Sequence, residues 1–291
     1  KVQTLSEIEI AFTADYIDYM AEWARRIEGE IINSDRPNEN IFLFRQPVGV
    51  VAGILPWNFP FFLIARKLGP ALVTGNSIVL KPSTDTPNNA AMFVELLNEI
   101  DIPKGMVNVI YGKGSTTGNA LCDNPDVGLV SFTGSVEVGS RIMAACAKNI
   151  TKVNLELGGK APAIVMADAD IDKTVTAVTA SRVINTGQAC NCAERVYVDR
   201  RVEDEFISKF STSMEATKYG DPGAIRDLDM GPMINRAAQE VTDNMVKRAV
   251  KDGAELVSGG QMSDVDGKGF FYQPTVLRNC EQSSETVSYT H

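Results

Sequence analysis

From residue 48 onward, short apolar runs alternate with longer segments of helical periodicity, and this alternation constrains the fold more than any other feature of the sequence. The expected strands are 48–55, 77–80, 106–111, 127–132 and 153–157, and the expected helices between them are 61–72, 88–99, 115–122 and 136–147. Such a rhythm is typical of an α/β fold, in which helices cover both faces of a parallel sheet.

The pattern continues beyond residue 157 and predicts a second α/β domain. Strands are expected at 163–166 and 195–198, and helices at 171–184, 202–217 and 236–252. We place the boundary at the Gly158-Gly159 pair, which gives domains 1–157 and 158–291. Residues 1–30 are expected to form one long amphipathic helix, because apolar residues recur there at steps of three and four.

Composition excludes several classes of function. The 28 Lys and Arg against 37 Asp and Glu leave a net charge of −9, which argues against a nucleic-acid partner. No apolar run approaches the ~18 residues that span a bilayer, and no signal peptide is visible, so no membrane partner and a cytoplasmic location are expected. The five cysteines are irregularly spaced, which indicates reduced thiols. The single histidine is His291, so histidine bases and histidine-bound zinc are disfavoured, and no metal is assigned.

Ligands of open parallel sheets bind beyond the carboxyl ends of the strands, so the loops there are informative. Asn58 follows the first expected strand, where it either caps the next helix or offers a side-chain amide. Lys81 ends the second strand, as a solvated terminus or as a point charge in a phosphate or ribose site. The glycine-rich loops 112–118 and 132–139 precede helices, where backbone N–H groups attract phosphates, although turn glycines are common.

Cys190 is the candidate nucleophile. Small and polar residues surround it at the end of an expected helix, whereas a buried structural thiol remains the alternative for both Cys190 and Cys192. Without a histidine, a thiol nucleophile needs another base for a hydrolytic step. Glu156 lies between two leucines in an expected strand, and burial there would raise its pKa towards the range useful for a general base.

Taken together, these segments resemble the aldehyde dehydrogenase superfamily over essentially the whole chain. Five motifs occur in the family's order and spacing: Pro56-Trp57-Asn58-Phe59-Pro60, Lys81-Pro82-Ser83, Phe132-Thr133-Gly134-Ser135, Leu155-Glu156-Leu157-Gly158-Gly159-Lys160 and Gly187-Gln188-Ala189-Cys190. The resemblance implies an aldehyde-dehydrogenase-like fold, with a Rossmann-type parallel sheet for NAD(P) and a second α/β catalytic domain. Segments 11–16, 61–67 and 190–198 resemble the branch that oxidises lactaldehyde and glycolaldehyde.

The resemblance also implies a mechanism. The Cys190 thiolate would attack the aldehyde carbonyl, and the Asn58 amide with the Cys190 backbone N–H would hold the oxyanion of the thiohemiacetal. After hydride transfer to NAD(P)+, Glu156 would activate the water that hydrolyses the thioester. Arg66, eight residues beyond Asn58 and expected on a similar helix face, would contact the substrate together with Asn191.

The implied cofactor is NAD or NADP. The residues that would contact it are Ile54, Pro56, Trp57, Asn58, Lys81, Ser83, Thr84, Gly114, Gly118, Gly134, Ser135 and Leu157. NAD-preferring members commonly have a glutamate where this chain has Thr84, and that glutamate repels a 2′-phosphate. We therefore expect NADP to be accepted.

Other family features give further expectations. Family members extend roughly a hundred residues beyond this sequence at each end, so the chain is expected to be a fragment that stops short of the Glu-Glu-x-Phe-Gly-Pro motif. The full-length form is expected to be a homo-oligomer, a dimer or a tetramer. Alternatives are another short aldehyde or semialdehyde as substrate, a CoA-acylating enzyme, which typically lacks the base glutamate, and a non-catalytic nucleotide-binding or scaffold fragment.

Overall fold

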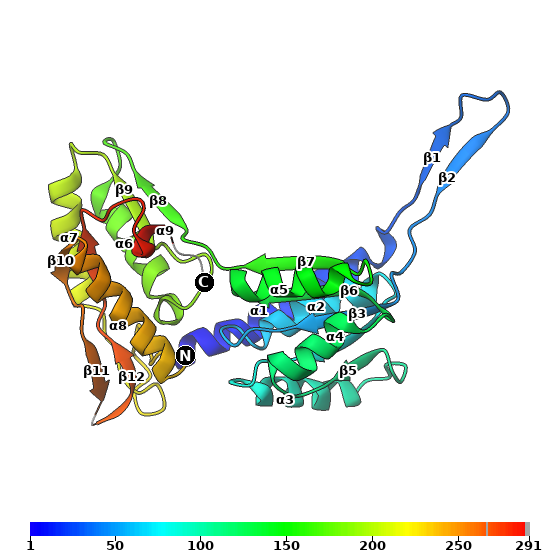
Figure 1. The fold of residues 1–291 in the computed structure, drawn as a ribbon, viewed down its shortest axis with the longest axis horizontal. Coiled ribbons are helices and arrows are strands. Elements are labelled where there is room, and N and C mark those ends of the chain that lie inside the picture. Colours follow the sequence, from blue (N-terminus) through cyan, green and yellow to red (C-terminus); the bar gives the residue numbers. More distant parts are fainter. Residues whose placement is uncertain (266, 289–291) are drawn as a thin grey trace. The chain divides into compact units, whose positions relative to one another are not determined.

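A computed structural model describes residues 1–265 and 267–288, and these residues form two compact units (Figure 1). One unit is Ile8–Leu157, and the other joins Lys1–Glu7 to the described residues from Gly158 onward. The sequence predicts that residues 1–7 belong to the N-terminal domain, but in the structure they belong to the same unit as the residues after 157. The reason is local packing, because Val2 is buried and the Glu7 carboxylate pairs with Arg226 at 2.8 Å.

The unit Ile8–Leu157 is built on a five-stranded sheet in which every neighbouring pair is parallel. The strands lie in the order β5-β4-β3-β6-β7, and their bounds are β3 Val50–Ile54, β4 Ser77–Lys81, β5 Val107–Val109, β6 Val127–Gly134 and β7 Lys152–Leu157. The predicted α/β class with a parallel sheet is confirmed.

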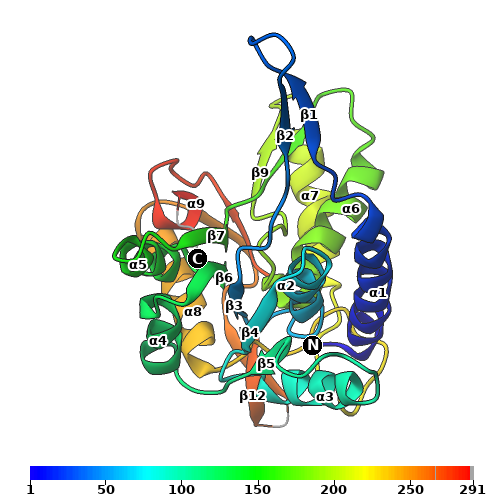
Figure 2. The ribbon, with the colours of Figure 1, turned by 90° about the vertical axis from the view of Figure 1, so that its right-hand side faces the viewer.

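Helices cover both faces of this sheet, as Figure 2 shows. Helices α2 (Phe62–Val73) and α3 (Pro87–Asn98) pack on the face that carries Val51, Ile78 and Leu80. Helices α4 (Asn119–Asp123) and α5 (Val136–Ala147) pack on the opposite face, against the alternate residues of the same strands, such as Ala52, Val130 and Phe132. Two-residue alternation along each strand therefore supplies two separate apolar cores.

The strand order creates a topological switch point between β3 and β6. From β3 the chain moves outward through β4 to β5, and it then returns to β6 on the other side of β3. The helices that follow β3 and β6 consequently pack on opposite faces of the sheet, and sheets of this topology bind ligands at such a point. Asn58 lies in the loop after β3, and Ser135 lies in the loop after β6.

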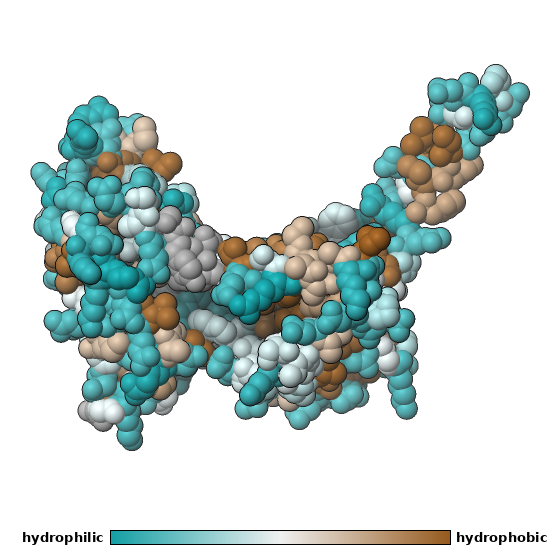
Figure 3. All heavy atoms as spheres, in the orientation of Figure 1, coloured by the Kyte–Doolittle hydropathy of each residue, from teal (hydrophilic) through white to brown (hydrophobic). Residues whose placement is uncertain are grey.

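The predicted single helix over residues 1–30 is wrong at its end. Helix α1 spans Gln3–Ala21, a short turn covers Glu22–Arg25, and an antiparallel hairpin follows, with strands β1 (Glu30–Asn33) and β2 (Asn40–Leu43). Asn38, with φ of 67°, allows the chain to reverse in the hairpin loop. Several apolar side chains in the hairpin and directly after it are exposed, such as Ile31 by 71% and Phe44 by 80%, and Figure 3 shows this brown surface.

The other unit has its own core beneath α6 (Ile171–Val183) and α7 (Glu203–Glu215). Its remaining elements are the parallel pair β8 (Pro162–Val165) and β9 (Arg195–Val198), helix α8 (Arg236–Lys251), the antiparallel pairs β10 (Glu255–Ser258) with β13 (Val276–Arg278) and β11 (Met262–Val265) with β12 (Lys268–Tyr272), and the short α9 (Glu285–Ser288). Among the helices of the described ranges, none combines the length and apolarity that crossing a membrane requires.

Candidate active site

Asn58 does not cap a helix. Helix α2 begins at Phe62, and its first N–H groups, those of Phe61 and Phe62, donate to the Glu9 carboxylate at 2.8 and 3.2 Å. A carboxylate at this position satisfies the amide groups and complements the helix dipole. Asn58 stands four residues before the helix, where the Phe59 N–H donates to its Oδ1 at 3.0 Å. The capping alternative for Asn58 is therefore wrong, and its amide remains a candidate for binding a ligand.

The expected burial of Glu156 is wrong. Its side chain is 52% exposed, because β7 is the edge strand and helix α5 packs on the opposite face, which carries Leu155 and Leu157. The carboxylate instead lies 3.6 Å from the guanidinium of Arg66 on α2. Glu156 is thus an accessible carboxylate held by one cation.

Arg66 is exposed on α2 and reaches Glu156, but the prediction that it shares a helix face with Asn58 is wrong. Asn58 precedes α2, so the two residues share no helix face. The structure brings Arg66 together with Glu156 through the sheet, because α2 and the Glu156 side chain lie on the same sheet face.

Lys67 is the residue that the sequence reasoning missed. It occupies the buried stripe of α2 between Leu63 and Ala71, and only 7% of it is exposed. Its Nζ donates to Ser131 Oγ and Thr133 Oγ1 of β6, both at 3.0 Å. A lysine at an apolar helical position was the available signal. Thr133 pairs with Glu156 in the β6–β7 register, so Lys67 lies beside the candidate base.

Burial, reinforced by the neighbouring Arg66 charge, lowers the pKa of Lys67 to about 8, against a smaller opposing effect of Glu156. In the unfolded chain this pKa returns to 10.5. Between these values the unfolded chain binds more protons than the folded one, so the free energy of unfolding rises with pH. Between pH ~7 and ~10, the unfolding free energy of the unmodified protein should rise by about 2 kcal/mol relative to that of the Lys67→Met variant. Urea unfolding at both pH values measures this gain.

The control for this experiment is Lys104→Met, because Lys104 is exposed. Its difference from the unmodified protein should be the same at both pH values. A constant difference for Lys67→Met would contradict the assigned burial of the ammonium group.

Lys81 is not a solvated strand terminus. It ends β4, is 4% exposed, and donates from Nζ to the Pro82 carbonyl at 3.0 Å, and burial lowers its pKa. A Cβ built on Gly118 would lie 3.9 Å from the Lys81 side chain, so the π-helical turn Gly114–Gly118 passes close to it. Thr84 is exposed in the loop after Lys81.

In the loop after β6, glycines allow the backbone to pack closely against neighbouring side chains. Ser135 caps α5, since the Val138 N–H donates to its Oγ at 3.3 Å. A Cβ on Gly134 would overlap the Phe132 ring, and one on Gly139 would lie 2.6 Å from Leu157. Tight glycine packing at the start of a helix, next to a switch point, is the arrangement that holds a pyrophosphate.

The remaining predicted cofactor residues also lie at the carboxyl edge. Ile54 is the last residue of β3 and pairs with Phe132, while Pro56 and Trp57 are half-buried just beyond it. The predicted cofactor residues of the loops after β3, β4, β5 and β6 therefore border one edge of one sheet.

The Cys190 segment lies in the other unit and follows an unusual turn. After α6, residues Asn185, Thr186 and Gly187 have φ values of 47°, 63° and 72°. Left-handed backbone costs a non-glycine residue on the order of 1–3 kcal/mol, and it persists where surrounding contacts impose it. Here Thr186 Oγ1 donates to the Gly231 carbonyl at 3.0 Å. Cys190 and the adjacent Asn191 follow this turn and are both exposed.

Exposure distinguishes Cys190 from the other thiols. Cys122, Cys146 and Cys192 are buried, and Cys280 is half-buried. Burial raises the pKa of Cys122 to about 12 and also raises the pKa of Cys146 and of Cys280. A nucleophile must be accessible to its substrate, and of the five cysteines, all of them among the described residues, Cys190 is the exposed one.

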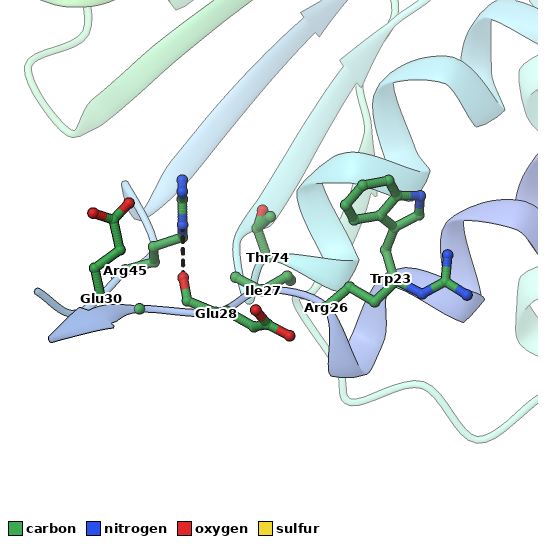
Figure 4. A pocket seen from close by; sticks show the side chains of 8 residues that line it. Trp23, Arg26, Ile27, Glu28, Glu30, Arg45 and Thr74 are labelled. Carbon is green, nitrogen blue, oxygen red and sulfur yellow. Dashed lines mark hydrogen bonds between the residues drawn. The ribbon is translucent and has the colours of Figure 1, made fainter.

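Within residues 1–265 and 267–288, no group of three His, Cys, Asp or Glu side chains is arranged to hold a metal ion. His291 lies outside the described residues. The pocket drawn in Figure 4, about 450 Å³, lies at the base of the hairpin, lined by Trp23, Arg26, Ile27, Glu28, Gly29, Glu30, Arg45 and Thr74. Thr74 precedes β4, so this pocket lies at the amino edge of the sheet, and no predicted site residue lines it.

Known proteins share this sequence and fold. Residues 1–289 match the sequence model of the "Aldehyde dehydrogenase family". Lactaldehyde dehydrogenase of Escherichia coli (strain K12) is 58% identical over 97% of this chain, and D-glyceraldehyde dehydrogenase (NADP(+)) of Thermoplasma acidophilum is 40% identical over 95%. The crystal structure of the E. coli lactaldehyde dehydrogenase superposes with a TM-score of 0.96 at 57% identity, over 99% of this chain and 60% of that one. The chain spans 58% and 56% of the lengths of the two relatives.

Proposed function

This chain belongs to the aldehyde dehydrogenase family, and we propose that the whole protein oxidises short hydroxyaldehydes such as lactaldehyde and glycolaldehyde to carboxylic acids with NAD(P)+. The observation that carries the proposal is the exposed Cys190 thiol, presented directly after a left-handed turn. The similarity to lactaldehyde dehydrogenase supports the choice of substrate. Production of NAD(P)H from glycolaldehyde by the intact protein tests it.

In the proposed mechanism, Cys190 supplies the nucleophile. Its thiolate adds to the aldehyde carbonyl, and the carbonyl oxygen becomes an oxyanion. The Cys190 backbone N–H and the Asn58 side-chain amide donate to this oxyanion, and one such donor contributes roughly 3–4 kcal/mol to the stabilisation of the transition state. When bound, NAD(P)+ would supply the hydride acceptor needed to oxidise the resulting thiohemiacetal to a thioester on Cys190.

Glu156 is the proposed general base for hydrolysis of the thioester on Cys190. Its accessible carboxylate can accept a proton from a water molecule as that water attacks the thioester carbonyl. Arg66 is ion-paired with this carboxylate, and together with Asn191 it is proposed to contact the substrate. Carbon–sulfur cleavage then releases the carboxylic acid and restores the thiol.

The residues at the carboxyl edge of the sheet fit a dinucleotide. We propose that the start of α5 at Ser135 holds the pyrophosphate, that Lys81 and Ser83 face the adenosine ribose, and that Gly114 and Gly118 lie on the adenine side. Ile54, Pro56 and Trp57 would line the nicotinamide end, and Leu157 would also contact the cofactor. Glu137, the acidic residue of the first turn of α5, is ion-paired with Arg141, which offsets its charge near an anion.

Thr84 should allow NADP to serve as coenzyme, because no carboxylate at this position repels the 2′-phosphate. The NADP(+)-dependent D-glyceraldehyde dehydrogenase relative is consistent with this. Introducing the missing charge with Thr84→Glu should lower kcat/KM for NADP by about 100-fold relative to NAD, because juxtaposed like charges cost several kcal/mol. Steady-state kinetics with both coenzymes measure the ratio, and Asp85→Asn serves as a nearby exposed control. An overwhelming NAD preference of the unmodified protein would refute the proposal.

Two other functions have less support from the structure. A CoA-acylating enzyme would not need Glu156, which is present and accessible. A non-catalytic nucleotide-binding fragment would not need an exposed thiol after a strained turn. A semialdehyde remains the second substrate class.

We also propose that the whole protein is a homo-oligomer that covers the exposed apolar side chains of the β1–β2 hairpin. An isolated two-stranded hairpin is marginally stable in water, so Phe44 and Ile31 would gain from burial. Light scattering of the intact protein should give a multiple of the chain mass, and Phe44→Glu should lower it. A monomeric intact protein would contradict this proposal.

A further inference from the structure

Cys192, the second cysteine of the C-x-C pair, has no part in the proposed function, yet its surroundings are unusual. The thiol is 1% exposed. Its Sγ lies 3.2 Å from the Gly187 carbonyl and 3.0 Å from the Ala189 carbonyl, and it accepts a hydrogen bond from Arg182 Nη1 at 3.0 Å. A buried free cysteine usually behaves as a small apolar side chain, so three polar contacts on one sulfur point to a specific task.

The two carbonyls that Cys192 contacts belong to the segment that carries Cys190. Gly187 is the last residue of the left-handed turn, and Ala189 directly precedes Cys190. The residue between them is also held, because the Ile234 N–H donates to Gln188 Oε1 at 2.9 Å. Strained backbone persists where its surroundings over-determine it, so each of these contacts helps to hold the nucleophile in place.

Arg182 connects the thiol to a buried ion pair. Its Nη1 also donates to Glu194 Oε1 at 3.3 Å, and Glu194 Oε2 pairs with Lys160 Nζ at 2.8 Å. The side chains of Glu194 and Lys160 are only 6% and 9% exposed. A Cβ on Gly187 would lie 2.7 Å from Arg182, so the guanidinium packs directly against the turn. From one position, the planar guanidinium can donate hydrogen bonds to the Cys192 sulfur and the Glu194 carboxylate and also pack against the turn.

We propose that Cys192 is a positioning residue, whose thiol, held by Arg182, fixes the Gly187–Ala189 backbone and thereby aims Cys190 at its substrate. The inference rests on the proposed function, which makes Cys190 the nucleophile. Its consequence is that removing the Cys192 sulfur slows the chemistry at Cys190 although Cys192 touches no substrate.

The test compares Cys192→Ala, Cys192→Ser and Cys146→Ala in the intact protein. Cys192→Ala should lower kcat about tenfold with little change in the KM for glycolaldehyde, because misplaced reacting groups slow the chemical step. It should also change the rate at which iodoacetamide alkylates Cys190, which peptide mass spectrometry measures. Cys192→Ser should restore most of both values, since a hydroxyl also donates to a carbonyl and accepts from Arg182.

Cys146→Ala is the matched control, because it removes an equally buried thiol, 1% exposed, from the other unit. It should lower the melting temperature comparably and leave kcat and Cys190 alkylation unchanged. Arg182→Lys is the second test variant. A lysine keeps the positive charge but lacks the planar guanidinium group that contacts both Cys192 and Glu194, so the kinetics of this variant should resemble those of Cys192→Ala.

The proposal is overturned if Cys192→Ala matches Cys146→Ala in both kcat and alkylation rate, or if Cys192→Ser fails to restore either. Failure of the proposed function is a separate result. An unmodified protein that oxidises no aldehyde would refute that function, while the alkylation rates, which need no turnover, would still decide the role of Cys192.

Discussion

Cys190→Ser is expected to lower kcat/KM for glycolaldehyde oxidation by roughly 10⁴-fold or more, as loss of a nucleophile does in other covalent catalysts. A serine hydroxyl is a far weaker nucleophile than a thiolate, and residues 1–265 and 267–288 contain no histidine that could activate it. The production of NAD(P)H by the intact protein measures the effect. Trapping with iodoacetamide should label Cys190 first in the unmodified protein, because it is the exposed thiol.

Cys280→Ser is the control, because Cys280 is half-buried and has no proposed role in the reaction. Its activity should equal that of the unmodified protein. Substantial oxidation by Cys190→Ser would refute the covalent mechanism, and absence of oxidation in the unmodified protein would favour a non-catalytic fragment.

Glu156→Gln is expected to separate the two halves of the reaction. Attack by Cys190 and the hydride step need no base at Glu156, so one equivalent of NAD(P)H should form in a rapid burst. Hydrolysis of the thioester should then slow by about 10²–10⁴-fold, the usual contribution of a general base. Stopped-flow absorbance should show the burst, and intact-mass measurement should show an acyl adduct on Cys190.

Glu95→Gln, an exposed substitution on α3, provides the control and should show no accumulated adduct. If Glu156→Gln turns over at the unmodified rate, Glu156 is not the base. If added CoA restores turnover to a stalled adduct, the thioester is accessible to thiols, and the CoA-acylating alternative gains support.

The helices and strands of the parallel sheet were predictable because their determinants are local. Alternation along β3 and β4, and steps of three and four along α2, place apolar residues on the faces that become buried. The hairpin β1–β2 was missed because its apolar residues cover no core in this chain, so the helical pattern before it was extended too far.

The local setting of Glu156 and Lys67 could not be predicted. An apolar neighbourhood in the sequence suggested that Glu156 is buried, but strand order made β7 an edge. Lys67 and its partners Ser131 and Thr133 are 64 and 66 residues apart, and Glu9 caps a helix 52 residues away. None of these contacts leaves a pattern within one segment.

The sequence by itself determined which residues can carry the chemistry and the order of strands and helices that holds them. Thiol, amide and carboxylate reactivity belong to single residues, and periodicity belongs to short segments. Only the tertiary structure decided that Glu156 is exposed beside Arg66, that Lys67 is buried, and that the Cys192 sulfur contacts the turn before Cys190. The physical reason is that burial, ion pairing and backbone strain depend on which distant segments pack together, and strand order sets that packing.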